Sequence, residues 1–76
     1  MFKKDLLSAR IYELRTTKNL TQQALADVVG IKKSAISMIE NGQRAASIEL
    51  LCALADYFNV SLDYLCGRTD NPEISK

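Results

Sequence analysis

The sequence predicts an all-α protein, a compact five-helix bundle that includes a helix-turn-helix. Apolar residues recur at intervals of three and four along five successive segments, which is the spacing of amphipathic helices. An Asn or a Gly follows each segment, where a left-handed backbone ends a helix at little cost. The stretch 21–42 has the spacing of two short helices that meet at a tight corner.

The composition is that of one small globular domain. Its 76 residues are 47% apolar and 25% charged, and a chain of this length buries only about 60% of its extended surface. The net charge is +1, but residues 1–44 hold eight Lys or Arg and four Asp or Glu (+4), whereas residues 45–76 hold two and five (−3). A basic half that contains the stretch 21–42 favours a nucleic-acid partner, although plain solvated faces carry similar charge.

Several protein classes are disfavoured. The longest apolar run, 50–55, is too short for a signal peptide or a membrane span, so we expect no membrane partner and a cytoplasmic location. Cys52 and Cys66, with no His, cannot form a four-ligand zinc site and fit a core better than a disulfide. With no Gly-rich phosphate loop and no evident carboxylate pair, we expect no catalytic residues, metal, cofactor or small-molecule ligand.

The first helix is predicted over residues 5–17. Leu7, Ile11 and Leu14 are spaced four and three apart and form one apolar stripe. Asn19 is predicted to end the helix, because Asn adopts a left-handed backbone more readily than other non-Gly residues.

The second helix is predicted between Thr21, whose hydroxyl caps it, and Gly30, which ends it. Leu25 and Val29 share one face. Ala26 falls where the next helix approaches most closely, and a larger side chain there would force the two helices apart.

The third helix is predicted over residues 33–40, with Ile36 and Ile39 facing the core and 41–42 ending it. Together the second and third helices have the pattern of a helix-turn-helix, whose second helix enters the major groove of DNA. The alternative from this stretch alone is an ordinary helical hairpin in a small bundle.

Ser47 is predicted to cap a fourth helix that reaches Phe58, before Asn59 ends it. Its buried stripe is predicted to comprise Ile48, Leu51, Leu54, Ala55 and Phe58.

Ser61 is predicted to cap a short fifth helix through Cys66. We expect residues 1–67 to form the domain and residues 68–76 to form a polar C-terminal tail that is mobile unless it docks.

The five-helix order completes a resemblance to the lambda-repressor-like, or Cro-type (XRE-type), helix-turn-helix regulators, over roughly residues 6–67. The segments that carry it are Leu-Arg (14–15), Leu-Thr-Gln-Gln-Ala-Leu-Ala (20–26), Val-Gly-Ile (29–31), Ile-Ser-Met-Ile-Glu-Asn-Gly (36–42), Leu-Ala-Asp (54–56) and Val-Ser-Leu-Asp-Tyr-Leu (60–65). One departure is Lys32, where the family has a Ser or Thr cap worth about 1 kcal/mol. A later helix start, capped by Ser34, is the alternative.

The resemblance implies that the third helix reads base edges and that residues around it bind phosphates. Because Ile36 and Ile39 face the core, the outward side chains of the third helix are predicted to be Lys33, Ser34, Ser37 and Met38. The remaining DNA-binding residues that we expect are Thr21, Gln22, Lys32, Asn41, Gln43 and Arg44. The residues expected to support this surface are Arg15, Glu40, Ala26 and Gly30. In the family, the positions of Arg15 and Glu40 pair across helices. The alternative for these two residues is a pair of independent surface charges.

The resemblance implies a sequence-specific, double-stranded DNA-binding transcriptional regulator, and we expect a prophage-type repressor on a two-fold-related operator. The alternatives are an antitoxin or restriction-modification controller on the same scaffold, or a protein-interaction module that has lost DNA binding. A homodimer is expected, because apolar residues in the C-terminal third are left over once the core stripe is filled: Leu50, Tyr57, Tyr64 and Cys66.

Overall fold

The computed structural model describes residues 4–44 and 46–74. Within these ranges the chain forms five α-helices and no strand: α1 Lys4–Thr17, α2 Gln22–Val29, α3 Lys33–Glu40, α4 Ile48–Phe58 and α5 Leu62–Leu65. The predicted all-α fold and the order of its helices are confirmed, and the helix ends fall within one residue of those expected from the sequence.

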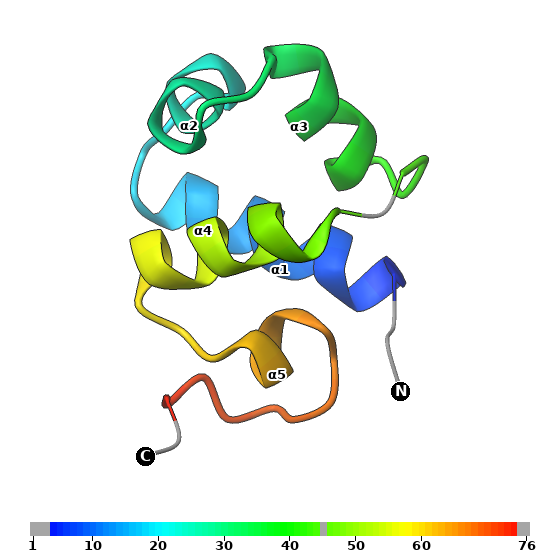
Figure 1. The fold of residues 1–76 in the computed structure, drawn as a ribbon, viewed down its shortest axis with the longest axis vertical. Coiled ribbons are helices and arrows are strands. Elements are labelled where there is room, and N and C mark those ends of the chain that lie inside the picture. The colour runs from blue at the N-terminus through cyan, green and yellow to red at the C-terminus, as the bar shows by residue number, and fades with distance from the viewer. Residues whose placement is uncertain (1–3, 45, 75–76) are drawn as a thin grey trace.

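The helices α1 and α4 lie across the middle of the molecule, with α2 and α3 on one side and α5 on the other (Figure 1). Helix α3 packs on α1 and α2, and α5 packs on α1 and α4. The largest fully buried side chains come from all five helices: Leu7, Ile11, Leu25, Ile36, Ile39, Leu54 and Leu65. One small core therefore holds every helix in place.

Local signals fix the helix ends. Thr21, Ser47 and Ser61 each accept a hydrogen bond, at 3.0–3.2 Å, from the backbone N–H three residues further along. Asn19 and Asn59 have φ of 58° and 56°, which is the left-handed conformation. These five sequence predictions are confirmed, and each rests on chemistry within one turn of chain.

The start of α3 lacks such a cap. Lys32 occupies the N-cap position with an extended backbone, and its side chain makes no capping hydrogen bond. The helix nevertheless begins at Lys33, so the alternative of a later start capped by Ser34 is wrong. Packing of the helix on its neighbours replaces the missing cap, because tertiary contacts supply most of the stability of a short helix.

The fourth helix corrects two predictions. Ile48, expected in the core, is 64% exposed, whereas Leu50, expected to remain outside it, is only 8% exposed. Leu50 lies four residues before Leu54 and so extends the buried stripe, whereas Ile48 is the first residue of the helix.

A buried hydrogen bond joins α1 to α3. The side chain of Ser8 is buried, and its hydroxyl donates to the carbonyl oxygen of Ile39 at 2.6 Å.

The segment after α5 packs against the bundle. The guanidinium of Arg10 donates to the carbonyl oxygens of Tyr64 and Thr69, the latter at 2.8 Å, and to Oδ1 of Asp70 at 2.7 Å. The N–H of Ser61 donates to the carbonyl oxygen of Pro72 at 2.9 Å. Residues 69–72 are therefore docked on α1 and the start of α5, while a domain boundary at residue 67 stays a prediction.

The corner between α2 and α3 depends on Ala26 and Gly30. Ala26 is fully buried, and Gly30 has φ of 75° while its N–H donates to the carbonyl oxygen of Ala26. We predict that Ala26→Leu overpacks this corner and lowers the free energy of unfolding by about 1–3 kcal/mol, measured by thermal denaturation. Ala9→Leu, at an exposed position of α1, is the control and should change little. Equal midpoints for the two variants would contradict the tight contact at Ala26.

Candidate nucleic-acid interface

One face of α3 belongs to the core and the opposite face lies open. Ala35, Ile36 and Ile39 are buried. The side chains of Lys33, Ser34 and Met38 are exposed and that of Ser37 is half-buried. The outward strip at positions 34, 37 and 38 therefore exists as the periodicity of the sequence predicts, and it carries two hydroxyls and one thioether. Such groups can contact base edges and the thymine methyl group.

The ends of α3 place further polar groups beside this strip. Lys32, immediately before the helix, is exposed. Asn41, Gln43 and Arg44 follow the helix on an exposed loop, and the N–H of Asn41 donates to the carbonyl oxygen of Ser37 at 3.0 Å. The outward strip is thus preceded by the ammonium group of Lys32 and followed by the side-chain N–H donors of Asn41, Gln43 and Arg44. Donors at both ends of α3 are suited to phosphates on either side of a groove.

The N-terminus of α2 opens near the C-terminus of α3. Thr21 caps α2, and the half-buried side chain of Gln22 lies in its first turn. Nε2 of Gln22 donates to Oε1 of Glu40, the last residue of α3, at 3.1 Å. A helix N-terminus presents unpaired N–H groups and the positive end of its dipole, so an anion is favoured there.

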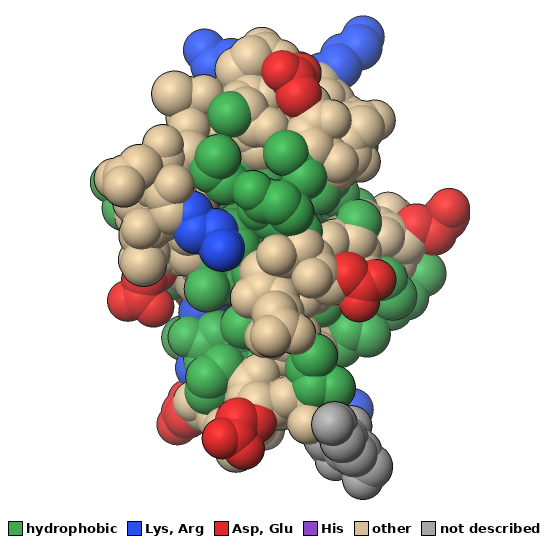
Figure 2. All heavy atoms as spheres, turned by 90° about the vertical axis from the view of Figure 1, so that its left-hand side faces the viewer, with side chains coloured by type: hydrophobic (Ala, Val, Ile, Leu, Met, Phe, Trp, Pro, Cys, Tyr) green, Lys and Arg blue, Asp and Glu red, His purple; other side chains and the backbone are tan. Residues whose placement is uncertain are grey.

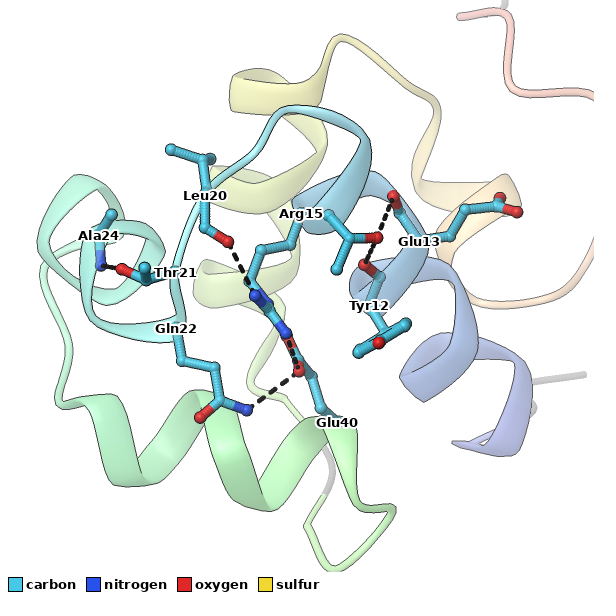
Figure 3. Close-up of polar contacts among 9 residues, drawn as sticks. Tyr12, Glu13, Arg15, Leu20, Thr21, Gln22, Ala24 and Glu40 are labelled. Atoms are coloured by element: carbon cyan, nitrogen blue, oxygen red, sulfur yellow. Dashed lines mark hydrogen bonds and ion pairs between the residues drawn. The ribbon is translucent and has the colours of Figure 1, made fainter.

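Arg15 and Glu40 join α1 to α3 beside Gln22 (Figure 3). Nε and Nη2 of Arg15 donate to the two carboxylate oxygens of Glu40 at 2.6 and 2.9 Å, and Nη1 donates to the carbonyl oxygen of Leu20 at 2.7 Å. The two side chains are only 11% and 4% exposed. The hydrogen bond to Glu40 raises the pKa of Arg15 above its ordinary value, against the smaller opposing effect of burial. The two residues form a buried bidentate pair and are not independent surface charges.

Charge is distributed unevenly over the surface. On the face drawn in Figure 2, Lys and Arg side chains project from the end that α2 and α3 occupy, with an acidic side chain between them. Further basic atoms lie near the middle of this face, and most acidic side chains lie below that end. On this face, basic side chains are thus more prominent toward the end of α2 and α3, and acidic side chains toward the opposite end. Lys32 and Lys33 are both exposed at the start of α3, and a phosphate backbone would approach these charges favourably.

The residues predicted for a dimer contact do not form one exposed patch. Leu50 is buried in the core. The guanidinium carbon of Arg10 lies 4.1 Å from the ring centroid of Tyr64, and burial raises the pKa of the half-buried Cys66 thiol. Tyr57 alone of the four is exposed. The sequence pattern did not predict the partial burial of Tyr64 and Cys66, because α1 and the docked C-terminal segment cover part of α5.

The sequence analysis also missed the bond between Gln22 and Glu40. It joins residues 18 positions apart through two flexible side chains, so no periodic pattern records it. In the described ranges, no group of three or more Cys, Asp, Glu or His side chains is arranged to hold a metal ion. None of the described helices has the length and apolar composition needed to cross a membrane.

Comparison with known proteins places the chain among DNA-binding regulators. The helix-turn-helix family profile matches residues 11–65. The HTH-type transcriptional regulator AnsR of Bacillus subtilis is 46% identical over 59 residues, which are 78% of this chain and 51% of AnsR. The chain therefore spans about half the length of this curated relative.

Two solved structures share the fold and a substantial part of the sequence. The restriction-modification controller protein C.AhdI from Aeromonas hydrophila superposes with a TM-score of 0.74 at 32% identity, covering 82% of this chain and 94% of that protein. The P22 c2 repressor, solved in complex with a synthetic operator, has a TM-score of 0.75 at 35% identity, covering 79% and 91%. The chain belongs to the helix-turn-helix family of lambda-repressor-like (XRE-type) DNA-binding regulators.

Proposed function

We propose that the chain binds double-stranded DNA in a sequence-specific manner and regulates transcription, as a prophage-type repressor in the bacterial cytoplasm. Helix α3 enters the major groove, and the start of α2 and the loop after α3 bind the flanking phosphates. The observation that carries the proposal is the open polar strip of α3 beside the capped N-terminus of α2. Similarity to the operator-bound P22 c2 repressor supports it.

Selection of bound sites from random duplex DNA tests this function directly. The expected product is a short consensus with two-fold symmetry and half-sites one helical turn apart, about 34 Å. A protein-interaction module that has lost DNA binding would enrich no sequence and would show no salt-dependent affinity for any duplex.

A restriction-modification controller is the second candidate, favoured by the similarity to C.AhdI. The protein would bind DNA by the same surface under either assignment, because the two functions differ in the regulated gene and not in the chemistry of recognition. Mapping the selected consensus onto the chromosome that carries the gene separates them: a repressor has its operator beside phage genes, and a controller has it beside a nuclease and methyltransferase pair.

The phosphate contacts have a specific signature in the dependence of affinity on salt. We predict that Lys32→Ala or Arg44→Ala weakens binding to every duplex alike and reduces the magnitude of the salt slope by about 1, because one fewer counterion is released. Gln22→Ala should also weaken all binding, but with no change in slope, since the amide is uncharged. Arg68→Ala, at an exposed position beyond α5, is the control. Salt slopes equal to that of the parent protein in both cation variants would contradict these contacts.

We further propose that two copies associate through the C-terminal side of the domain. An open groove of about 370 Å³ lies between α4 and α5, with apolar lining from Cys52, Ala55, Leu62 and Ile74 and polar lining from Asp56, Ser61 and Asp63. Ile48, exposed one turn before Cys52 on α4, extends this apolar surface. We propose this apolar surface as the dimer contact, in place of the patch of Leu50, Tyr57, Tyr64 and Cys66 predicted from the sequence. A second copy would cover the surface around a two-fold axis.

Sedimentation equilibrium, with and without the selected operator, measures this association. We predict two protein chains on each symmetric operator, and a monomer–dimer equilibrium for the protein alone that Ile48→Lys shifts toward monomer. Glu13→Lys, at an exposed position of α1, is the control. A strict monomer that binds only single half-sites would show that the two-fold assembly is wrong.

A further inference from the structure

Glu40 occupies the point where three helices of the proposed interface meet. Its Oε1 accepts hydrogen bonds from Nη2 of Arg15 on α1, at 2.9 Å, and from Nε2 of Gln22 on α2, at 3.1 Å. Its Oε2 accepts from Nε of Arg15 at 2.6 Å. Figure 3 shows the three side chains pointing toward one another, and that of Gln22 is half-buried. The buried pair is therefore connected to a half-buried residue at the surface.

The chemistry of Glu40 determines which end of the Gln22 amide faces it. A carboxylate held by Arg15 can only accept hydrogen bonds, so Gln22 must turn its NH₂ group, and not its carbonyl oxygen, toward Glu40. One N–H is used in this contact, and the second N–H of the same nitrogen stays available. A glutamine without such a partner would sample several rotamers and lose that freedom on binding a ligand.

Arg15 removes a conflict that this arrangement would otherwise create. An uncompensated carboxylate beside the N-terminus of α2 would repel a phosphate at the place where the helix dipole attracts it. The bidentate contact at 2.6 and 2.9 Å balances the charge of Glu40 while one of its oxygens keeps its contact with Gln22. Glu40 can therefore orient the amide of Gln22 without repelling a phosphate at the start of α2.

We propose that Glu40 is a positioning residue for DNA binding: it holds the amide of Gln22 so that the second N–H points toward a backbone phosphate at the start of α2. This inference rests on the proposed function. It differs from a purely structural role for the Arg15–Glu40 pair, which would stabilise the fold and leave the contribution of Gln22 to DNA affinity independent of Glu40.

A double-mutant cycle distinguishes the two roles. The variants are Gln22→Ala, Glu40→Gln and the double variant, and the probe is a nonspecific duplex of about 20 base pairs at low salt, because a phosphate contact does not depend on sequence. In the parent protein, Gln22→Ala should weaken binding by about tenfold or more, the effect of one hydrogen bond to a charged group. In the protein that already carries Glu40→Gln, the same replacement should weaken binding by less than about twofold. Glu40→Gln also removes the charged partner of Arg15 and alters overall affinity. That change is present both with and without Gln22→Ala in the Glu40→Gln background, so it cancels from the effect of Gln22→Ala.

Gln23 supplies the matched control. Its amide bonds to Asp27 within α2, at 2.8 Å, and is exposed. Gln23→Ala should change affinity by the same factor in both backgrounds. If Glu40→Gln fails to fold, Glu40→Asp takes its place, since it keeps the charge beside Arg15 and withdraws the carboxylate from Gln22 by one methylene. A second measurement needs no DNA: in the parent protein the side-chain amide proton of Gln22 that bonds to Glu40 should be shifted downfield in the NMR spectrum from its position in a free glutamine, and it should return toward that position in the Glu40 variant.

Each outcome decides a different claim. An equal loss from Gln22→Ala in both backgrounds overturns the positioning role, and so does no loss in the parent protein, while DNA binding by other residues stands. No affinity of the parent protein for any duplex overturns the proposed function itself.

Discussion

Replacing Arg15 with methionine is expected to lower the free energy of unfolding by about 3–5 kcal/mol, the largest effect on stability that we predict for one substitution at this surface. The reason is the position of its partner. The side chain of Glu40 is 4% exposed, so the variant would bury a carboxylate that has lost both of its strong donors. The carbonyl oxygen of Leu20 would lose a donor as well. Chemical denaturation at neutral pH measures the change.

Two further variants separate the loss of the pair from the loss of any arginine. Arg68→Met removes a guanidinium that lies 3.8 Å from Asp63 with both side chains largely exposed, and it should cost less than about 1 kcal/mol. Arg15→Met combined with Glu40→Met removes both charges, and it should recover most of the stability lost in the single variant. A single Arg15 variant as stable as the Arg68 variant would contradict a buried, bidentate pair.

The features that the sequence predicted correctly are those encoded within one or two turns of chain. The hydroxyl of Thr21 and the αL conformation of Asn19 need only neighbouring residues, so the pattern alone placed the helix boundaries. The core face of α3 was predicted equally well, because Ile36 and Ile39 stand three apart in a short helix with few other apolar residues.

The misses share a different cause, which is contact between distant parts of the chain. Whether Ile48 or Leu50 is buried depends on which edge of α4 the other helices cover, and α4 itself is apolar on both edges. Arg10 reaches carbonyl oxygens more than 50 positions away, so nothing near it in the sequence predicts the docked C-terminal segment. The Gln22–Glu40 bond likewise requires the corner between α2 and α3 to be built first.

Replacing Ser34, Ser37 and Met38 together with alanine is expected to weaken binding to the selected operator by about 3–6 kcal/mol. Three base contacts of about 1–3 kcal/mol each would sum to about 3–9 kcal/mol, and neighbouring side chains on one strip add incompletely. All three side chains lie on the open face of α3, opposite the residues that it buries in the core. Alanine favours a helix, so stability should be preserved. Affinity for nonspecific duplexes should stay nearly unchanged, since the proposed phosphate contacts lie elsewhere.

The measurement compares affinity for the operator with affinity for an unrelated duplex at one salt concentration, together with thermal unfolding of each variant. Glu13→Ala combined with Thr17→Ala, at exposed positions of α1, is the control and should leave both affinities unchanged. Lys33→Ala tests the edge of the readout strip: we expect it to change the preferred base at one operator position, through loss of a donor to guanine. If instead Lys33→Ala weakens all duplexes equally and the triple variant keeps the parent preference, then α3 meets DNA through a different face and the base-reading residues must be reassigned.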